Sequence, residues 1–475
     1  MRLALRAFWL LVFPLSLAGQ TPTDTVKLNP VVVTATRIPT PAADLPVAVT
    51  VVSGEQLREQ GIRTVAEALR TVPGASVVTT NAYGSQTSLF LRGGESDYVK
   101  VLIDGVPQNA PGGAYDFANL TTDNVERIEV VRGPASVLYG SDAMTGVVQI
   151  FTREGRGAAH GSVAVTGGTY GSNAVDATLT GGGERAGYAV GLSRFSSDGV
   201  YSIDNQYRNE VLSGRVRVRP DERTDAALSL RYGDALYHFP TDGGGAVVSN
   251  NQHQIDRGPS IGLDLGHRFS GRVEGRLTAD WHRDNSQYAI GPNSPADTTT
   301  FPYSSSDWVT RTGLDARLNV TLAARDVITV GGALERQAMN GTTLDMPRSR
   351  NDGAVYVQLV SPLERSVSLA VGARLEDNQR FGTYATYRSG MSLRIAGGTR
   401  AIASVGTGFK EPSFYENFAT GFVRGNPDLR PEHSLNWEIG LEYRGLRRTL
   451  TARATYFHQR FRDLKIGRAS CRERV

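Results

Sequence analysis

The feature that most constrains the fold is a long series of short alternating segments that begins after residue 155. In each segment of about ten residues apolar and polar side chains alternate, and Gly, Asp, Asn and Ser separate the segments. Examples are residues 186–195, 213–219, 226–232, 261–269, 273–281, 312–320, 327–335, 354–360 and 367–374. A strand that crosses a bilayer needs about 9 to 11 tilted residues that face lipid and lumen in turn. About fifteen such segments predict an all-β, antiparallel transmembrane β-barrel over residues 155–466.

The connections between these segments alternate in length. Residues 219–224 form a short polar connection, whereas residues 233–259 and 285–307 form long ones. Short turns at one end and long loops at the other are typical of outer-membrane barrels. A soluble β-solenoid or adhesin would also alternate, but its turns would repeat at a fixed period, which we do not find. The pattern favours the barrel.

The start of the chain predicts export from the cytoplasm. Residues 1–20 combine Arg2 and Arg6 with an apolar run over residues 7–17 and small residues near position 18, as in a secretory signal peptide. A retained membrane anchor is the alternative, although the run is about half as long as a spanning helix requires. After residue 20 the sequence has no run of about 18 apolar residues, so we expect no transmembrane helix.

Composition agrees with an exported barrel and excludes some partners. The chain has 53 glycines, 18 tyrosines and 16 phenylalanines with low overall hydropathy, as expected where lipid-facing and lumen-facing residues alternate. Its net charge of +4 comes from 51 basic and 47 acidic residues that are spread along the chain, which argues against a nucleic-acid partner. Cys471 is the only cysteine, so no intramolecular disulfide can form.

Residues 21–44 are predicted to form an extended, mobile arm, because four prolines interrupt short polar stretches. The arm contains the run Val31, Val32, Val33, Thr34 and Ala35, which has high β-propensity. This run is either an unpaired strand that pairs with another protein or the first strand of the following domain.

Residues 45–152 predict one small α+β domain. Ser53 with Gln56, and Thr64 with Glu67, each match a capping box that starts a helix. Strands are expected at residues 88–92, 99–103, 125–131 and 147–151, and Asp104-Gly105 forms a tight turn after the second of them.

Four ordered blocks in this domain carry a family resemblance. They are Leu91-Arg92-Gly93 and residues 101–107, 125–134 and 137–143, and they are similar in order and spacing to the plug signature of TonB-dependent receptors. A second set, at residues 405–414, 425–432 and 438–442, resembles the barrel signature of the same family. The chain is therefore identified as a member of the TonB-dependent outer-membrane receptors.

The resemblance implies a plug inside a barrel of about 22 strands, in the outer membrane, that actively imports a scarce, bulky solute. Val31, Val32, Val33, Thr34 and Ala35 then correspond to the TonB box. The implied partners are TonB with its inner-membrane energising complex, outer-membrane lipid, a small-molecule substrate and a periplasmic substrate-binding protein downstream. Gating replaces chemistry in such a protein, so we expect no enzyme and no required cofactor.

Plug spacing and short apical loops look most like the cobalamin (vitamin B12) transporter branch. The resemblance places six residues toward the substrate: Tyr83, Gly84, Ser85, Gln86, Asn109 and Tyr115. Glycines such as Gly84 allow backbone to approach a ligand closely, and ordinary loop formation explains them equally well. A ferric-siderophore receptor is the alternative within the family. A passive porin, a secreted enzyme and an adhesin are the alternatives outside it.

Two further sets of residues are predicted, one to hold the plug in the barrel and one that could bind calcium. Arg92, Glu126, Arg127, Glu129 and Arg132 are expected to hold the plug against the polar lumen wall. Glu126 and Glu129 could alternatively form a general-acid pair, but three residues apart on a strand they point to opposite faces. Asp234, Asp242 and Asp256 could bind calcium, as the cobalamin transporter does in its early extracellular loops, or be solvated loop aspartates.

The end of the chain departs from the family pattern. Fifteen strands are fewer than the roughly 22 of family barrels, and bacterial barrels need an even number to close. Residues 467–475 carry three arginines and the single cysteine without a terminal aromatic residue. We therefore expect a non-native tail at 467–475 and a partial barrel over residues 155–466.

Overall fold

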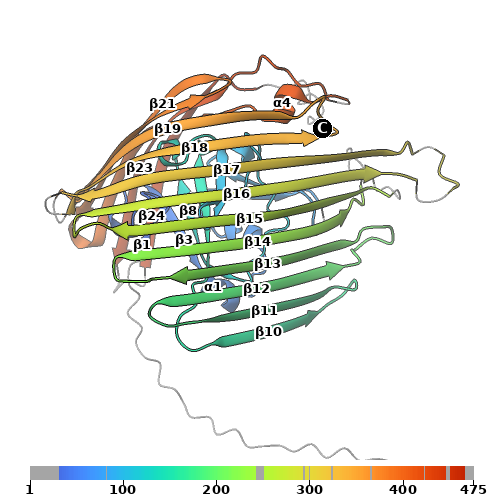
Figure 1. Cartoon of the computed structure of the whole chain (residues 1–475), viewed down its shortest axis with the longest axis horizontal. Helices are drawn as coiled ribbons and strands as arrows, with labels where there is room; N and C mark the ends of the chain where they lie inside the picture. Colours follow the sequence, from blue (N-terminus) through green and yellow to red (C-terminus); the bar gives the residue numbers. More distant parts are fainter. Residues whose placement is uncertain are drawn as a thin grey trace, which may run out of the picture.

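The computed structural model describes residues 31–465, except 82, 242–245, 247–250, 293–294, 299, 323–324, 364–365, 422 and 446–449. Its main element is a fifteen-stranded antiparallel sheet that curves around a smaller N-terminal domain (Figure 1). The signal peptide predicted at residues 1–20 and the tail predicted at 467–475 lie outside the described residues. The predicted fold class, a β-barrel around an α+β plug, is confirmed.

The large sheet pairs consecutive strands in chain order, from β10 at one edge to β24 at the other. Its strands are β10 His160–Gly167, β11 Asn173–Gly182, β12 Ala186–Ser197, β13 Tyr207–Val218, β14 Thr224–His238, β15 His253–Arg268, β16 Val273–Ile290, β17 Tyr303–Thr321, β18 Val327–Gly341, β19 Arg348–Ser361, β20 Val367–Asn378, β21 Gly382–Ile395, β22 Thr399–Lys410, β23 Glu432–Gly445 and β24 Leu450–Arg462. Several are longer than the 9 to 11 residues predicted, because antiparallel pairing also satisfies the backbone beyond the lipid. Segments that the sequence assigns to long loops therefore continue as strand.

Alternation along each strand separates a lipid face from a lumen face. In β15, Ile261, Leu263 and Leu265 are 38%, 37% and 36% exposed on the outer side. Their neighbours Ser260 and Gly262 face inward toward the plug. Large apolar side chains exposed at every second position fit a surface that contacts lipid.

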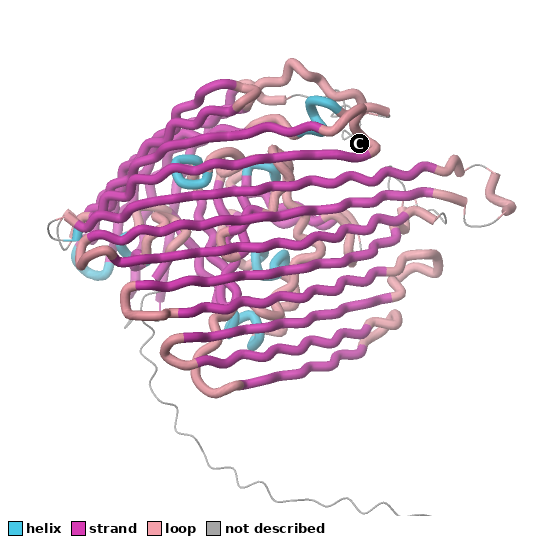
Figure 2. Tube along the Cα trace, in the orientation of Figure 1, coloured by secondary structure: helices cyan, strands magenta, loops and turns pink. Residues whose placement is uncertain are grey.

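The two ends of the sheet differ (Figure 2). One end, called here the short-turn end, has connections at residues 183–185, 219–223, 269–272 and 322–326. The other, called the long-loop end, has connections at residues 198–206, 239–252, 291–302 and 411–431, the last of which includes helix α4 Phe414–Phe418. The short η4 turn Ala396–Gly398 joins β21 to β22. Among the described residues, no helix is long and apolar enough to cross a membrane.

The plug is an α+β domain built on a five-stranded sheet of order β3-β8-β9-β6-β7, in which β6 and β9 are parallel. Its elements are β3 Ala48–Ser53, α1 Gly54–Glu59, α2 Val65–Arg70, β4 Ala75–Thr79, β5 Thr87–Leu91, η2 Ser96–Tyr98, β6 Val99–Ile103, β7 Val106–Pro107, β8 Val125–Arg132, α3 Ser136–Tyr139 and β9 Gly146–Thr152. Both predicted capping boxes are formed, at Ser53 and Thr64. Asp104 and Gly105 have φ of +49° and +90°, as the predicted turn between β6 and β7 requires.

The arm is packed against the plug rather than free. Strand β1 Val31–Val32 pairs with β2 Thr40–Pro41, and the η1 turn Ala42–Asp44 leads into the plug. Val32 is fully buried in an apolar cluster with Leu45, Val47 and Val131. The prediction of a mobile arm is therefore wrong for residues 31–44, because its valines bury apolar surface on the plug.

Candidate functional site

Tyr83 lies at the long-loop end of the plug, beside β12 and β13. Its ring is 56% exposed and packs edge-on against Phe195 of β12, with ring centroids 5.1 Å apart. Tyr207 of β13 stacks with Tyr83 and lies tilted against Phe195. Gly84 has φ of +79°, and an added Cβ would lie 2.3 Å from the Tyr207 ring. Close approach to the barrel wall therefore explains this glycine.

Three other residues predicted to face the substrate differ in exposure. Gln86 is exposed, whereas Ser85 is 2% exposed and its Oγ accepts the Asn81 N–H. Asn109 is fully buried, and its amide bonds the backbone of Val99 and Val101. The predicted contact with substrate is wrong for Ser85 and Asn109, because both side chains stabilise loop backbone inside the plug.

Tyr115, the last of the predicted substrate residues, lines a cavity of about 250 Å³ between plug residues 108–119 and strands β13–β16, called here the upper cavity. Asp116 and Gln108 line the same cavity from the plug. Burial raises the pKa of Asp116 to about 6. The N–H groups of Thr87 and Ala118 donate to its carboxylate and oppose this rise in pKa. Sequence reasoning missed Asp116 and Gln108, because nothing local shows that they meet the barrel here.

Asp234 and Asp256, two of the predicted calcium aspartates, both line the upper cavity, but each is engaged by other side chains. Asp234 pairs with Arg208 and Arg257 at 3.3 Å and 3.0 Å, and Asp256 accepts from the Gln254 amide. Asp242 lies outside the described residues. Within the described part of the chain, no three His, Cys, Asp or Glu residues are grouped as a metal site would require. Calcium binding remains a prediction.

Glu129 holds the valine run against the plug. Its Oε2 accepts the backbone N–H of Val33 at 3.0 Å and of Thr34 at 2.9 Å, and the Thr34 hydroxyl at 2.7 Å. The Tyr139 hydroxyl donates to the Thr34 carbonyl at 2.9 Å. Val31 is 49% exposed, but Val32, Thr34 and Ala35 are buried. The run is thus paired and docked, where the sequence predicted an unpaired strand or a domain strand.

Arg37 joins the arm to the barrel near the short-turn end. Its guanidinium donates to Asp315 of β17 at 2.6 Å and to the Tyr356 hydroxyl of β19 at 3.0 Å. It also lies over the Tyr139 ring, 4.9 Å from the centroid. Burial lowers the pKa of Arg37, but the Asp315 carboxylate outweighs burial and holds it above its ordinary value. Arg37 adopts φ of +56°, so the arm turns sharply at this contact.

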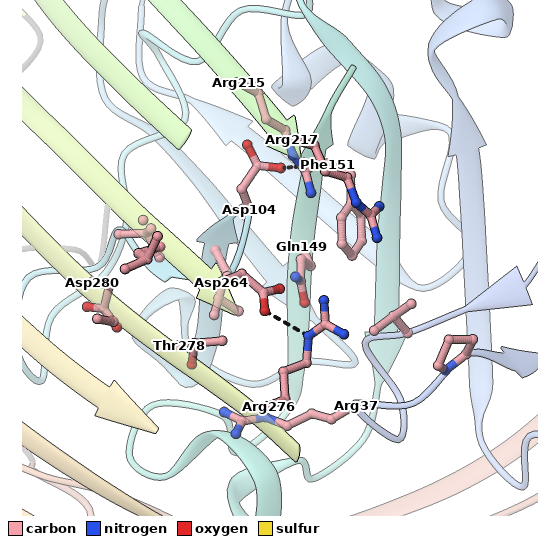
Figure 3. Close-up of a pocket in the computed structure, with 18 of the residues that line it drawn as sticks. Arg37, Asp104, Gln149, Phe151, Arg215, Arg217, Asp264, Arg276, Thr278 and Asp280 are labelled. Atoms are coloured by element: carbon pink, nitrogen blue, oxygen red, sulfur yellow. Dashed lines mark hydrogen bonds and ion pairs between the residues drawn. The ribbon is translucent and has the colours of Figure 1, made fainter. Parts of the chain in front are cut away.

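Beside Arg37 lies a cavity of about 330 Å³, called here the lower cavity (Figure 3). Charged side chains from plug and barrel line it, and the figure shows the Asp104–Arg215 and Asp264–Arg276 pairs. These pairs have N···O distances of 2.8 Å and 2.7 Å. The wall of the lower cavity is therefore rich in paired charges.

Of the five residues predicted to hold the plug to the barrel, Arg92 does so, through an ion pair with Glu438 of β23. The prediction is wrong for Glu126, Arg127, Glu129 and Arg132, because their hydrogen-bond partners belong to the plug or the arm. Glu126 accepts the Glu154 N–H, Arg127 pairs with Glu129, and Arg132 donates to the Pro73 carbonyl and to Thr50. Glu126 is well exposed and the Glu129 side chain fully buried, so the two do not form an acid pair.

Other plug–barrel pairs were not predicted. Asp97 pairs with Lys410 at 2.8 Å, and the Arg311 guanidinium donates to the Asn109 carbonyl at 3.0 Å. The Asp104–Arg215 pair is a third. All join residues more than a hundred positions apart, so no local pattern could show them.

Comparison with known proteins identifies the class of protein that this arrangement defines. The profile described as TonB-dependent Receptor Plug Domain matches residues 41–147, and that described as TonB dependent receptor-like, beta-barrel matches residues 157–467. The chain belongs to the TonB-dependent receptors, which are outer-membrane β-barrel proteins that interact with TonB and with small-molecule substrates.

The relatives with similar sequences include two vitamin B12 transporters. The chain is 27% identical over 443 residues to the vitamin B12 transporter BtuB of Photobacterium profundum, covering 90% of this chain and 70% of that one. It is 25% identical over 427 residues to the vitamin B12 transporter BtuB of Vibrio vulnificus, covering 86% and 67%.

Solved structures show the same fold. The siderophore receptor PirA from Acinetobacter baumannii superimposes with a TM-score of 0.74 at 18% identity, over 88% of this chain and 71% of that one. FpvAI, in its complex with pyocin S2, superimposes with a TM-score of 0.73 at 15% identity, over 90% and 66%.

Proposed function

We propose that this receptor imports cobalamin or a related corrinoid across the outer membrane. The observation that carries the proposal is its similarity to two vitamin B12 transporters over most of the chain. The siderophore receptors among the solved structures share the fold at 16–21% identity, which does not indicate the solute. A ferric siderophore is accordingly the alternative that the substrate test must include.

In the proposed cycle the solute first binds at the long-loop end, against Tyr83 and the mouth of the upper cavity. That cavity, at about 250 Å³, is small for a bulky ligand, since pockets for drug-sized ligands measure about 300 to 1,000 Å³. The solute therefore rests above the plug until the plug moves.

TonB then engages Val31–Ala35 as the TonB box. The docked strand must leave Glu129 and Tyr139 before it can pair with a partner, since the same backbone N–H groups serve both contacts. The arm must also leave the barrel wall, where Arg37 donates to Asp315 and the Gln358 amide donates to the Thr36 carbonyl. Once the solute has crossed, a periplasmic substrate-binding protein takes it up.

Proline at Val32 is expected to abolish energised uptake of labelled cyanocobalamin. Proline removes one backbone N–H and fixes φ, so strand pairing with TonB fails while binding at the far end of the plug persists. Uptake by cells that express the full-length gene and lack their own cobalamin receptor is the measurement. Val31→Thr keeps every N–H and is the matched control, expected to transport normally. Normal uptake by Val32→Pro would refute the assigned TonB box.

Replacing Tyr83 by alanine is expected to weaken cyanocobalamin binding about tenfold or more, as loss of a central aromatic contact commonly does. The conservative variant Tyr83→Phe keeps the ring against Phe195 and should bind nearly as well as the parent protein. Equilibrium binding to purified receptor measures both. Equal affinity of Tyr83→Ala and parent would remove Tyr83 from the binding site.

A further inference from the structure

Three cavities follow one barrel strand from the long-loop end to the arm. On the inner face of β16, Asp284 and His282 line the upper cavity, and Asp280 and Thr278 line a middle cavity of about 80 Å³. Asp280 and Thr278 also line the lower cavity, where Arg276 joins them (Figure 3). Side chains two residues apart share one face of a strand, so the cavities form a series along a single wall.

The hairpin of β6 and β7 interrupts this series. Gln108 lines the upper cavity and Val106 the lower one. The Gln108 amide donates to the Ser260 hydroxyl of β15 at 3.0 Å. A Cβ added at Gly262 of β15 would lie 2.6 Å from Cγ2 of Val106, so the hairpin lies directly against the barrel wall. Only a small residue at position 262 permits this contact.

The hairpin packs against β15 and β16 and is tied to that wall by polar contacts, and the arm lies beside them. Apart from the Gln108 hydrogen bond, Asp104 in its turn pairs with Arg215 of β13, with side chains 4% and 13% exposed. Val33 and Arg37 line the lower cavity together with Val106. Removing the arm therefore takes away part of the cavity wall next to the hairpin.

We propose that the imported solute passes between the β6–β7 hairpin and the inner face of β15 and β16, and that residues 106–108 form its gate. The inference rests on the proposed import function but not on the identity of the solute. Undocking of the arm opens the lower cavity, and the hairpin then swings from β15 and joins the upper cavity to the lower one. The rest of the plug stays docked against β20–β23.

A disulfide across the gate tests the route. In a Cys471→Ser background, Val106→Cys with Gly262→Cys places the two Cβ atoms within about 4.1 Å, because the 2.6 Å contact is lengthened by one C–C bond of about 1.5 Å. That separation suits a disulfide. The matched control is Met144→Cys with Gly408→Cys, where Cα of Met144 lies 3.0 Å from a Cβ added at Gly408 of β22, which bounds the Cβ separation at about 4.5 Å.

With labelled cyanocobalamin as the probe, oxidation of the gate pair is expected to reduce uptake at least tenfold, and reduction to restore it. Oxidation of the control pair should leave uptake within about twofold of the reduced protein. Uptake that persists through an oxidised gate pair, or that stops equally with the control pair, would overturn the route. Absent uptake by the reduced proteins counts against cobalamin as the solute instead.

A second measurement does not depend on the solute. Arg215→Gln with Ser260→Ala cuts one ion pair and one hydrogen bond that hold the hairpin. Glu438→Gln with Asn436→Ala cuts the same kinds of contact on β23, where Asn436 donates to the Met144 carbonyl. The first double variant is expected to raise entry of vancomycin, a large hydrophilic antibiotic, about tenfold, which corresponds to about 1.4 kcal/mol. The second double variant is not expected to raise vancomycin entry. Equal entry through both variants would contradict the gate.

Discussion

Replacing Glu129 by alanine is expected to release the arm from the plug without any substrate. The Glu129 carboxylate accepts three hydrogen bonds from Val33 and Thr34, all within 3.0 Å, in a site closed to water. Hydrogen bonds to a charged group contribute about 1.5–3 kcal/mol each. Even with partial compensation, the ratio of docked to released arm should fall about a hundredfold or more.

A spin label attached at Val31 measures this release, because the Val31 side chain is half exposed and tolerates the probe. With Cys471 replaced by serine, Val31→Cys is the only cysteine in the 475-residue sequence. The label should be immobile in the parent receptor and mobile in Glu129→Ala. Glu126→Ala removes a carboxylate from the same strand that does not contact the arm, and its spectrum should match that of the parent. An immobile label in Glu129→Ala would show that other contacts hold the arm.

Glu438→Ala is expected to lower the stability of the receptor strongly, because it leaves the Arg92 guanidinium unpaired. The two side chains are 6% and 3% exposed, and Arg92 also lies over the Phe457 ring. Removing one partner of a buried ion pair costs about 3–5 kcal/mol, because the other charge loses its compensation. The purified full-length receptor should therefore unfold at a temperature several degrees lower.

The double variant Arg92→Asn with Glu438→Ala shows whether the unpaired charge causes the loss of stability. Arg92 has φ of +57°, a conformation that asparagine tolerates better than most side chains. With both charges removed, thermal unfolding should move back toward the parent. If the double variant were less stable than Glu438→Ala, the loss would come from packing rather than from an unpaired charge.

Local patterns in the sequence predicted most of the fold. Capping boxes at Ser53 and Thr64, and the turn at Asp104-Gly105, depend on neighbours in the chain, and all three form. The period-two alternation predicted the fifteen strands of the sheet, because it records which side chains face lipid.

Long-range partners could not be predicted in the same way. Arg92 and Glu129 look alike in sequence as charged residues of plug strands. The first reaches β23, 346 positions away, whereas the second holds the arm. A charge pattern does not show which surface a strand will meet, so the plug contacts were correct for one residue of five.

The substrate residues show the same limit. Tyr83 is exposed and Tyr115 lines the upper cavity, whereas the Asn109 amide is hydrogen-bonded to the backbone of Val99 and Val101. Arg37 was missed because its role depends on a backbone φ of +56° and on a carboxylate from β17. Neither is visible in the arm sequence.

Titration of the purified full-length receptor with cyanocobalamin, and in parallel with ferric siderophores, tests the central claim most directly. We predict saturable binding of cyanocobalamin, weakened by Tyr83→Ala and unaffected by Val32→Pro, with no binding of ferric siderophores. A folded receptor that binds a ferric siderophore and not cyanocobalamin would contradict the proposed substrate.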